Sequence, residues 1–239
     1  MAKSAYKQRR SAAARILSRI SRSGDRFWRY EDFANLPAQA VAQSLSRLAR
    51  EGAIRRVRKG IYYRPRQTVL GESIPAKSEI AKQVLRRPLH PAGLTAANIL
   101  GFTTQNPGHS EFATPAHSAP DLLPGAHVYA RRPSSRAHLS EKEGALLEFL
   151  RARAHSSDLS PEETCQRLLA LLRQANMNRL LNAASTEPPR VRAILGALAE
   201  ELHIPQQELS RLRRNLNPLS RFNFGPLRNL RSARHWQAT

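Results

Sequence analysis

The sequence lacks the features that mark secreted or membrane-spanning proteins. Cys165 is its only cysteine, so no disulfide can form within the chain and a reducing compartment is expected. No run of residues approaches the ~18 apolar positions that a membrane-spanning helix needs. The basic start MAKSAYKQRR leads into alanines and not into the apolar core of a signal peptide. We therefore expect a cytoplasmic protein without a membrane partner.

Catalytic and metal-binding patterns are missing as well. The eight histidines stand at no metal-ligand spacing with a second ligand, and the sequence has neither a phosphate-binding glycine loop nor a nucleophile elbow. Ser110, Glu111 and His117 are the residue types of a catalytic triad, but a spacing of this kind arises by chance and does not indicate one. Cys165 is interpreted as a small buried residue of a leucine-rich helix. These observations predict no catalytic site, no metal and no cofactor, so we do not expect an enzyme.

Acidic residues are scarce where basic residues are densest. The chain carries 39 Lys and Arg against 18 Asp and Glu, a formal net charge of +21. Residues 1–66 hold 17 of the basic residues and 4 of the acids, a net of +13, whereas residues 67–135 reach +2 and residues 136–239 reach +6. A concentrated positive field attracts polyanions, and binding through phosphates weakens as salt rises.

The order of signals between residues 30 and 64 is typical of a winged helix-turn-helix. A short helical segment leads to Pro37, which is tolerated in the first turn of a helix because its missing N–H has no partner there. Apolar residues at helical spacing then predict a buried face: Val41, Leu45 and Leu48. Gly52 supplies the left-handed residue that often ends a helix. Two short strands turning at Lys59-Gly60 would complete a basic hairpin.

The opposite helix face and the hairpin carry the side chains expected to meet double-stranded DNA. Small polar groups and arginines reach base edges in the major groove, and clustered cations contact phosphates. The predicted DNA-binding residues are Gln39, Gln43, Ser46, Arg47, Arg50, Arg55, Arg56, Arg58 and Lys59. Ile54 and Val57 fall on opposite parities, which leaves the hairpin register open. A basic helix and hairpin also suit a solvated face or a protein-binding module.

The residues before this segment complete a first domain, placed at residues 1–66. An amphipathic stretch over about residues 5–22 predicts the first helix, with Ala13, Ile16, Leu17 and Ile20 on one side. Residues 27–29 are expected to be a short strand that pairs with the hairpin. Trp28 is interpreted as core packing and not as a stacking platform.

Residues 67–239 predict a second domain, and the expected fold class of the whole chain is α+β. Residues 67–135 have the Thr, Pro and Gly content of a small α/β segment, with helices over residues 75–87 and 91–100 and candidate strands at 112–114 and 127–130. Residues 136–239 are expected to be helical. Two capping boxes mark helix starts, Ser140 with Glu143 and Ser160 with Glu163, and prolines at 188–189 and 205 open further helices. The basic tail beyond residue 217 is either an ordered extension or loose.

Three segments in this order resemble one protein family. They are GIYYRPRQTVLGESIP (residues 60–75), GLTAANILGFTTQNPGHSEFATPA (residues 93–116) and EPPRVRAILGALAEEL (residues 187–202). Their order and spacing are similar to those of the AbiEi-type antitoxins of type IV toxin–antitoxin (abortive infection) systems, which act in phage resistance. The resemblance covers most of residues 10–202 and leaves out the tail after residue 217.

The resemblance implies a transcriptional repressor that binds inverted repeats in its own promoter through the winged helix. It also implies a carboxy-terminal domain that counteracts a cognate nucleotidyltransferase-like toxin, directly or through the toxin's target. Cooperative pairing of two copies on DNA would fit such repeats. A winged-helix regulator without a toxin, and a nucleic-acid enzyme delivered by the winged helix, are the alternatives.

Overall fold

The computed structural model describes residues 12–23, 26–69, 71–75, 79–80, 83, 88–118, 126–214 and 216–239, and it is a mixed α+β protein. The chain divides into two compact units, Met1–Val84 and Leu85–Thr239. We expected the boundary at residues 66 and 67. The segment after residue 66 stays attached to the first unit: the Ser73 hydroxyl bonds to the Tyr63 hydroxyl at 2.9 Å and accepts the Arg66 N–H at 2.7 Å. The expected helix over residues 75–87 lies largely outside the described residues.

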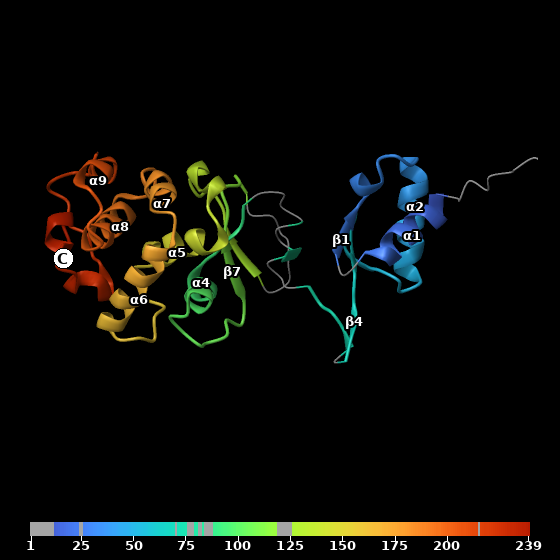
Figure 1. Cartoon of the computed structure of the whole chain (residues 1–239), viewed down its shortest axis with the longest axis horizontal. Helices are drawn as coiled ribbons and strands as arrows, with labels where there is room; N and C mark the ends of the chain where they lie inside the picture. Colours follow the sequence, from blue (N-terminus) through green and yellow to red (C-terminus); the bar gives the residue numbers. More distant parts are fainter. Residues whose placement is uncertain are drawn as a thin grey trace, which may run out of the picture. The chain divides into compact units, whose positions relative to one another are not determined.

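The first unit (blue to cyan in Figure 1) packs helices against a small antiparallel sheet. Its elements are α1 (Ala12–Arg22), β1 (Arg26–Arg29), the short η1 (Tyr30–Phe33), α2 (Ala38–Arg50), β2 (Arg55–Arg58) and β3 (Ile61–Arg64), followed by the hairpin β4 (Gln67–Thr68) and β5 (Gly71–Glu72). The sheet order is β1-β3-β2, so the predicted pairing of the 27–29 strand with the basic hairpin is confirmed.

Apolar faces of both helices meet the sheet in one core, whose buried members are Ile16, Ile20, Trp28, Phe33, Val41, Leu45, Leu48, Ile54 and Tyr62. Trp28 is 1% exposed, which confirms it as a core residue. Leu17 was expected on the same face of α1 but is 47% exposed, because helical geometry turns it about 100° away from its neighbour Ile16. Gly52 has a φ of +78° and closes α2 as predicted.

The second unit (green to red in Figure 1) starts with a three-stranded sheet of order β6-β7-β8. Its strands are β6 (His90–Pro91), β7 (Ser110–Ala113) and β8 (Ala126–Tyr129), with β7 and β8 parallel. Helix α4 (Gly93–Leu100) ends at Gly101, which takes the left-handed conformation with a φ of +74°. The helix begins at Gly93 and not at Pro91, since Pro91 pairs in β6 with Phe112.

The rest of the second unit is helical, as expected. It comprises η2 (Ser134–His138), α5 (Glu141–Arg151), α6 (Pro161–Gln174), α7 (Met177–Ala184), α8 (Pro189–Glu201), α9 (Gln206–Arg213), η3 (Gly225–Asn229) and η4 (Ala233–Trp236). Both predicted capping boxes are formed at the starts of α5 and α6. They satisfy backbone N–H groups that would otherwise lack partners, and thereby fix where each helix begins.

The basic tail is an ordered extension that packs on α8. Trp236 is 1% exposed, and its indole N–H donates to Glu200 at 2.8 Å. Gly196 makes room for the ring, because a Cβ at that position would come within 2.3 Å of it. The guanidinium of Arg213 lies 4.5 Å from the ring centroid on another side.

A buried network of ion pairs joins η2 to α5 and to Glu187, which lies just before α8. Arg136 is fully buried and bonds to the carboxylates of both Glu148 and Glu187, the latter at 2.5 Å. Arg132 binds Glu148 through two bonds of 2.7 and 3.1 Å, and Arg151 reaches Glu187 at 3.2 Å. Burial alone would favour a neutral Arg136. The hydrogen bond that Arg136 donates to Glu187 and the charges of the two carboxylates nevertheless hold the pKa of Arg136 above its usual value.

Candidate nucleic-acid interface

Helix α2 divides the first unit into an apolar and a polar surface. Its buried residues face the core, and all five predicted DNA contacts on the helix are exposed: Gln39, Gln43, Ser46, Arg47 and Arg50. Gln39, Gln43 and Arg47 follow one another at four-residue spacing, which puts them in one row along the helix. This row presents amides and a guanidinium, the groups that pair with base edges in the major groove.

The β2–β3 hairpin carries the other four predicted contacts, which are also exposed: Arg55, Arg56, Arg58 and Lys59. The pairing register shifts between Arg56 and Arg58, so Val57 stands in a β-bulge. The bulge accounts for the parity mismatch between the buried Ile54 and the partly buried Val57, because it inserts one extra residue into the strand. It also leaves the neighbouring arginines outward-facing on a strongly twisted strand.

The hairpin turn is held by two tyrosines that the sequence analysis did not single out. Gly60 has a φ of +77°, and a Cβ there would meet the ring of Tyr30 at 3.2 Å. The Tyr30 and Tyr62 rings lie 6.3 Å apart. Burial, followed by a side-chain hydrogen bond with Tyr30, raises the pKa of Tyr62 to about 12. The hairpin turn therefore packs against Tyr30 of η1. The only sequence signal for this packing was the Ile-Tyr-Tyr run after Gly60.

Several of these cations are free of acidic partners within the described part of the chain. Arg47 lies 3.6 Å from Glu51 across an exposed turn of α2, and Arg55 pairs with Glu72 of β5. Arg50, Arg56, Arg58 and Lys59 form no ion pair with another described residue. Exposed pairs contribute little stability, so both paired arginines are also open to exchange their carboxylate for a phosphate.

Glu111, one of the three residues considered as a triad, is held by two hydrogen bonds. Glu111 accepts the Leu94 N–H at 3.1 Å and the Tyr129 hydroxyl at 2.8 Å, so within the described chain it orients no histidine. Burial raises the pKa of the Cys165 thiol to about 11. Among the described residues, no group of three or more His, Cys, Asp or Glu side chains is arranged to hold a metal ion. No helix in the same residues is both long and apolar enough to cross a bilayer.

The model of a family of unknown function (DUF6088) matches residues 22–117, which include the α2 row and the β2–β3 hairpin. No curated protein matches the chain.

Proposed function

We propose that the first unit is a winged helix-turn-helix that binds double-stranded DNA. The observation that carries the proposal is the joint exposure of the polar α2 row and the cationic β2–β3 hairpin on one small folded unit. Support comes also from the element order of helix, strand, short helix, helix and two-stranded hairpin. In this arrangement α2 enters the major groove and the hairpin follows the neighbouring phosphates.

Charge supports the same reading. The net charge of +13 over residues 1–66 steers the unit towards a polyanion, and arginine forks suit both phosphate and guanine. Gln39, Gln43 and Ser46 add neutral groups that discriminate bases without adding general affinity. The unit therefore combines a sequence-independent and a sequence-reading surface.

We expect Arg47→Ala or Arg50→Ala to weaken binding to the specific site by about 1–3 kcal/mol, because a lost bidentate contact to a base costs that much. Affinity for a random duplex should change far less. Gel-shift titrations with the region upstream of the gene and with a scrambled duplex measure both effects. Arg173→Ala, an exposed arginine in the last turn of α6, is the matched control. Equal affinity of the native chain for both duplexes at moderate salt would exclude sequence reading.

We further propose that the chain is the antitoxin of a type IV system, repressing its own operon and counteracting a nucleotidyltransferase-like toxin. The three segments that resemble AbiEi-type antitoxins support this part. Two copies bound to inverted repeats would place their α2 helices about one helical turn, or a multiple of it, apart. The second unit would then carry the protective activity.

Growth of cells that express the neighbouring nucleotidyltransferase gene tests the antitoxin role. We expect the full chain to restore growth, and a full chain with neutral residues at the four hairpin cations to restore it equally while losing repression. The hairpin variant would thus still protect cells from the toxin although it no longer binds DNA. A native chain that represses its promoter but leaves the toxin fully active would favour a regulator without a toxin.

A further inference from the structure

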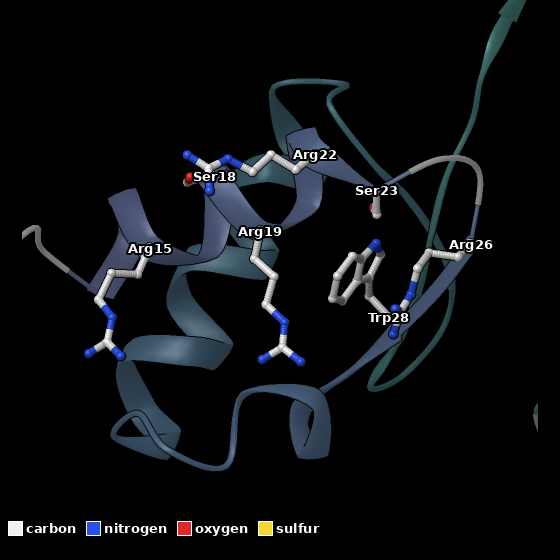
Figure 2. Close-up of a pocket in the computed structure, with 7 residues that line it drawn as sticks. All are labelled: Arg15, Ser18, Arg19, Arg22, Ser23, Arg26 and Trp28. Atoms are coloured by element: carbon white, nitrogen blue, oxygen red, sulfur yellow. The ribbon is translucent and has the colours of Figure 1, made fainter.

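A second cationic feature of the first unit lies away from the predicted contacts. Helix α1 and strand β1 border an open surface hollow of about 440 Å³, lined by four arginines, two serines and Trp28 (Figure 2). Arg15, Arg19 and Arg22 come from α1, and Arg26 comes from β1. Figure 2 shows the side chains of Arg19 and Arg26 on the two sides of the Trp28 indole.

Among the described residues, only one of the four arginines that line the hollow forms an ion pair with a carboxylate. Asp32 lies 3.3 Å from the Arg26 guanidinium, and its second carboxylate oxygen already accepts the Arg29 N–H at 2.7 Å. Arg19 donates to the Asp32 carbonyl oxygen at 2.6 Å and forms no ion pair with another of the described residues. Arg15 and Arg22 pair with no carboxylate of the described residues.

The end of α1 does not cancel this charge. Carbonyl oxygens at a helix carboxyl end carry partial negative charge, which would repel an anion. Here Arg64 reaches in from β3 and donates to the carbonyl oxygens of Ile20 and Ser23. The helix end is therefore compensated by a fifth arginine.

Trp28 supplies a polar group with no partner. Its indole Nε1–H is buried and forms no hydrogen bond with any of the described residues. The Ser23 hydroxyl donates to the Ile20 carbonyl oxygen at 2.8 Å and forms no hydrogen bond with the indole, although Figure 2 shows the indole nitrogen turned towards Ser23. A buried donor without an acceptor lowers the stability of the folded protein. A ligand oxygen that accepts this N–H would remove that cost. Trp236, the other tryptophan, has its N–H satisfied by Glu200.

We infer that this hollow binds a phosphate group. Its oxygens would accept the Trp28 N–H and bonds from the surrounding guanidinium groups, whose planar forks match phosphate geometry. The guanidinium of Arg26, whose carbon lies 4.0 Å from the centroid of the Trp28 ring, is exposed and moves aside to admit the oxygen. The phosphate comes either from a nucleic-acid backbone or from a free phosphate compound.

The two indole N–H groups allow a direct test on the full chain. With ¹⁵N-labelled tryptophan, we expect inorganic phosphate to shift the Trp28 indole signal saturably while chloride at equal ionic strength does not. The Trp236 signal should stay in place, because its hydrogen bond to Glu200 lies in the other unit. A Trp28 signal that ignores phosphate, or that follows chloride equally, overturns the inference.

Variants locate the response. Arg15→Gln with Arg22→Gln removes two exposed side chains and should weaken phosphate binding by at least about tenfold, given the strength of hydrogen bonds between charged groups. Arg173→Gln with Arg231→Gln makes the same charge change on exposed positions of the second unit and should leave it unaltered. If the variant with Arg15→Gln and Arg22→Gln binds phosphate as tightly as the native chain, the inference of a phosphate site in this hollow is wrong.

A duplex titration identifies the source of the phosphate. A Trp28 shift with duplex as well as with inorganic phosphate assigns the site to the nucleic-acid backbone, and a shift with inorganic phosphate alone assigns it to a free phosphate compound. The proposed DNA interface is tested separately through the hairpin variants. A hairpin variant that loses duplex binding yet keeps the phosphate shift at Trp28 would leave this site intact.

Discussion

Replacing Arg55, Arg56, Arg58 and Lys59 together by glutamine should lower affinity for every duplex by roughly 10²–10³-fold near physiological salt. Each cation that neutralises a phosphate contributes about 0.9 to the slope of log affinity against log salt. Losing four such contacts should make that slope shallower by about three to four units. Fluorescence anisotropy of a labelled duplex over a range of salt measures both quantities, for specific and random sequences alike.

The matched control removes the same charge from the tail. Arg221, Arg228, Arg231 and Arg234 are exposed on the second unit, and their replacement by glutamine lowers the net charge by the same four units. We expect only a small, general loss of affinity from this variant, because these residues belong neither to the α2 row nor to the β2–β3 hairpin. If tail and hairpin variants lose equal affinity, the total charge and not the hairpin governs binding.

Arg136→Ala should destabilise the second unit by about 3–5 kcal/mol. The substitution leaves the carboxylates of Glu148 and Glu187 buried with one cation each, and removing one partner of a buried ionic network costs that much. It also leaves a cavity where a fully buried side chain stood. Urea unfolding followed by Trp236 fluorescence in a Trp28→Phe background reports on the second unit alone, since Trp28 belongs to the first.

Arg179→Ala is the control for this experiment. Arg179 also bonds to a carboxylate, that of Glu143 at 2.8 Å, but its own side chain is 43% exposed. The Glu143 side chain is 4% exposed but also accepts the N–H groups of Ser140 at 2.8 Å and Asn176 at 3.3 Å. Because the carboxylate keeps these donors and Arg179 itself reaches solvent, we expect the loss of Arg179 to cost less than the loss of Arg136. A cost for Arg136→Ala no larger than that of Arg179→Ala would mean that water or a rearranged side chain replaces the buried cation.

Features encoded within one or two turns of chain could be predicted from the sequence. The capping boxes at Ser140 and Ser160 needed only a hydroxyl and a glutamate three residues on, and both are formed. The α2 face needed only helical spacing. The nine predicted contacts are exposed, but exposure does not test whether they bind DNA.

Features that depend on distant pairing could not be predicted in the same way. Arg136 stands in a Ser-Ser-Arg-Ala-His run that reads as solvated loop, while its partner Glu187 lies 51 residues away. The slot for Trp236 is made by the missing side chain of Gly196 on another helix. The α1–β1 hollow was missed for a similar reason, since its arginines come from two elements whose approach is set by the core.

Strand β2 has one further consequence for the free protein. It is an edge strand of its sheet, and an edge offers unpaired backbone groups to which another chain can add. The kink at Val57 and the like charges of Arg55, Arg56 and Arg58 oppose such addition. Two free copies of the chain should therefore not associate through the edge of β2. Pairing of copies would need another surface, or a bound polyanion that neutralises the repulsion between the arginines.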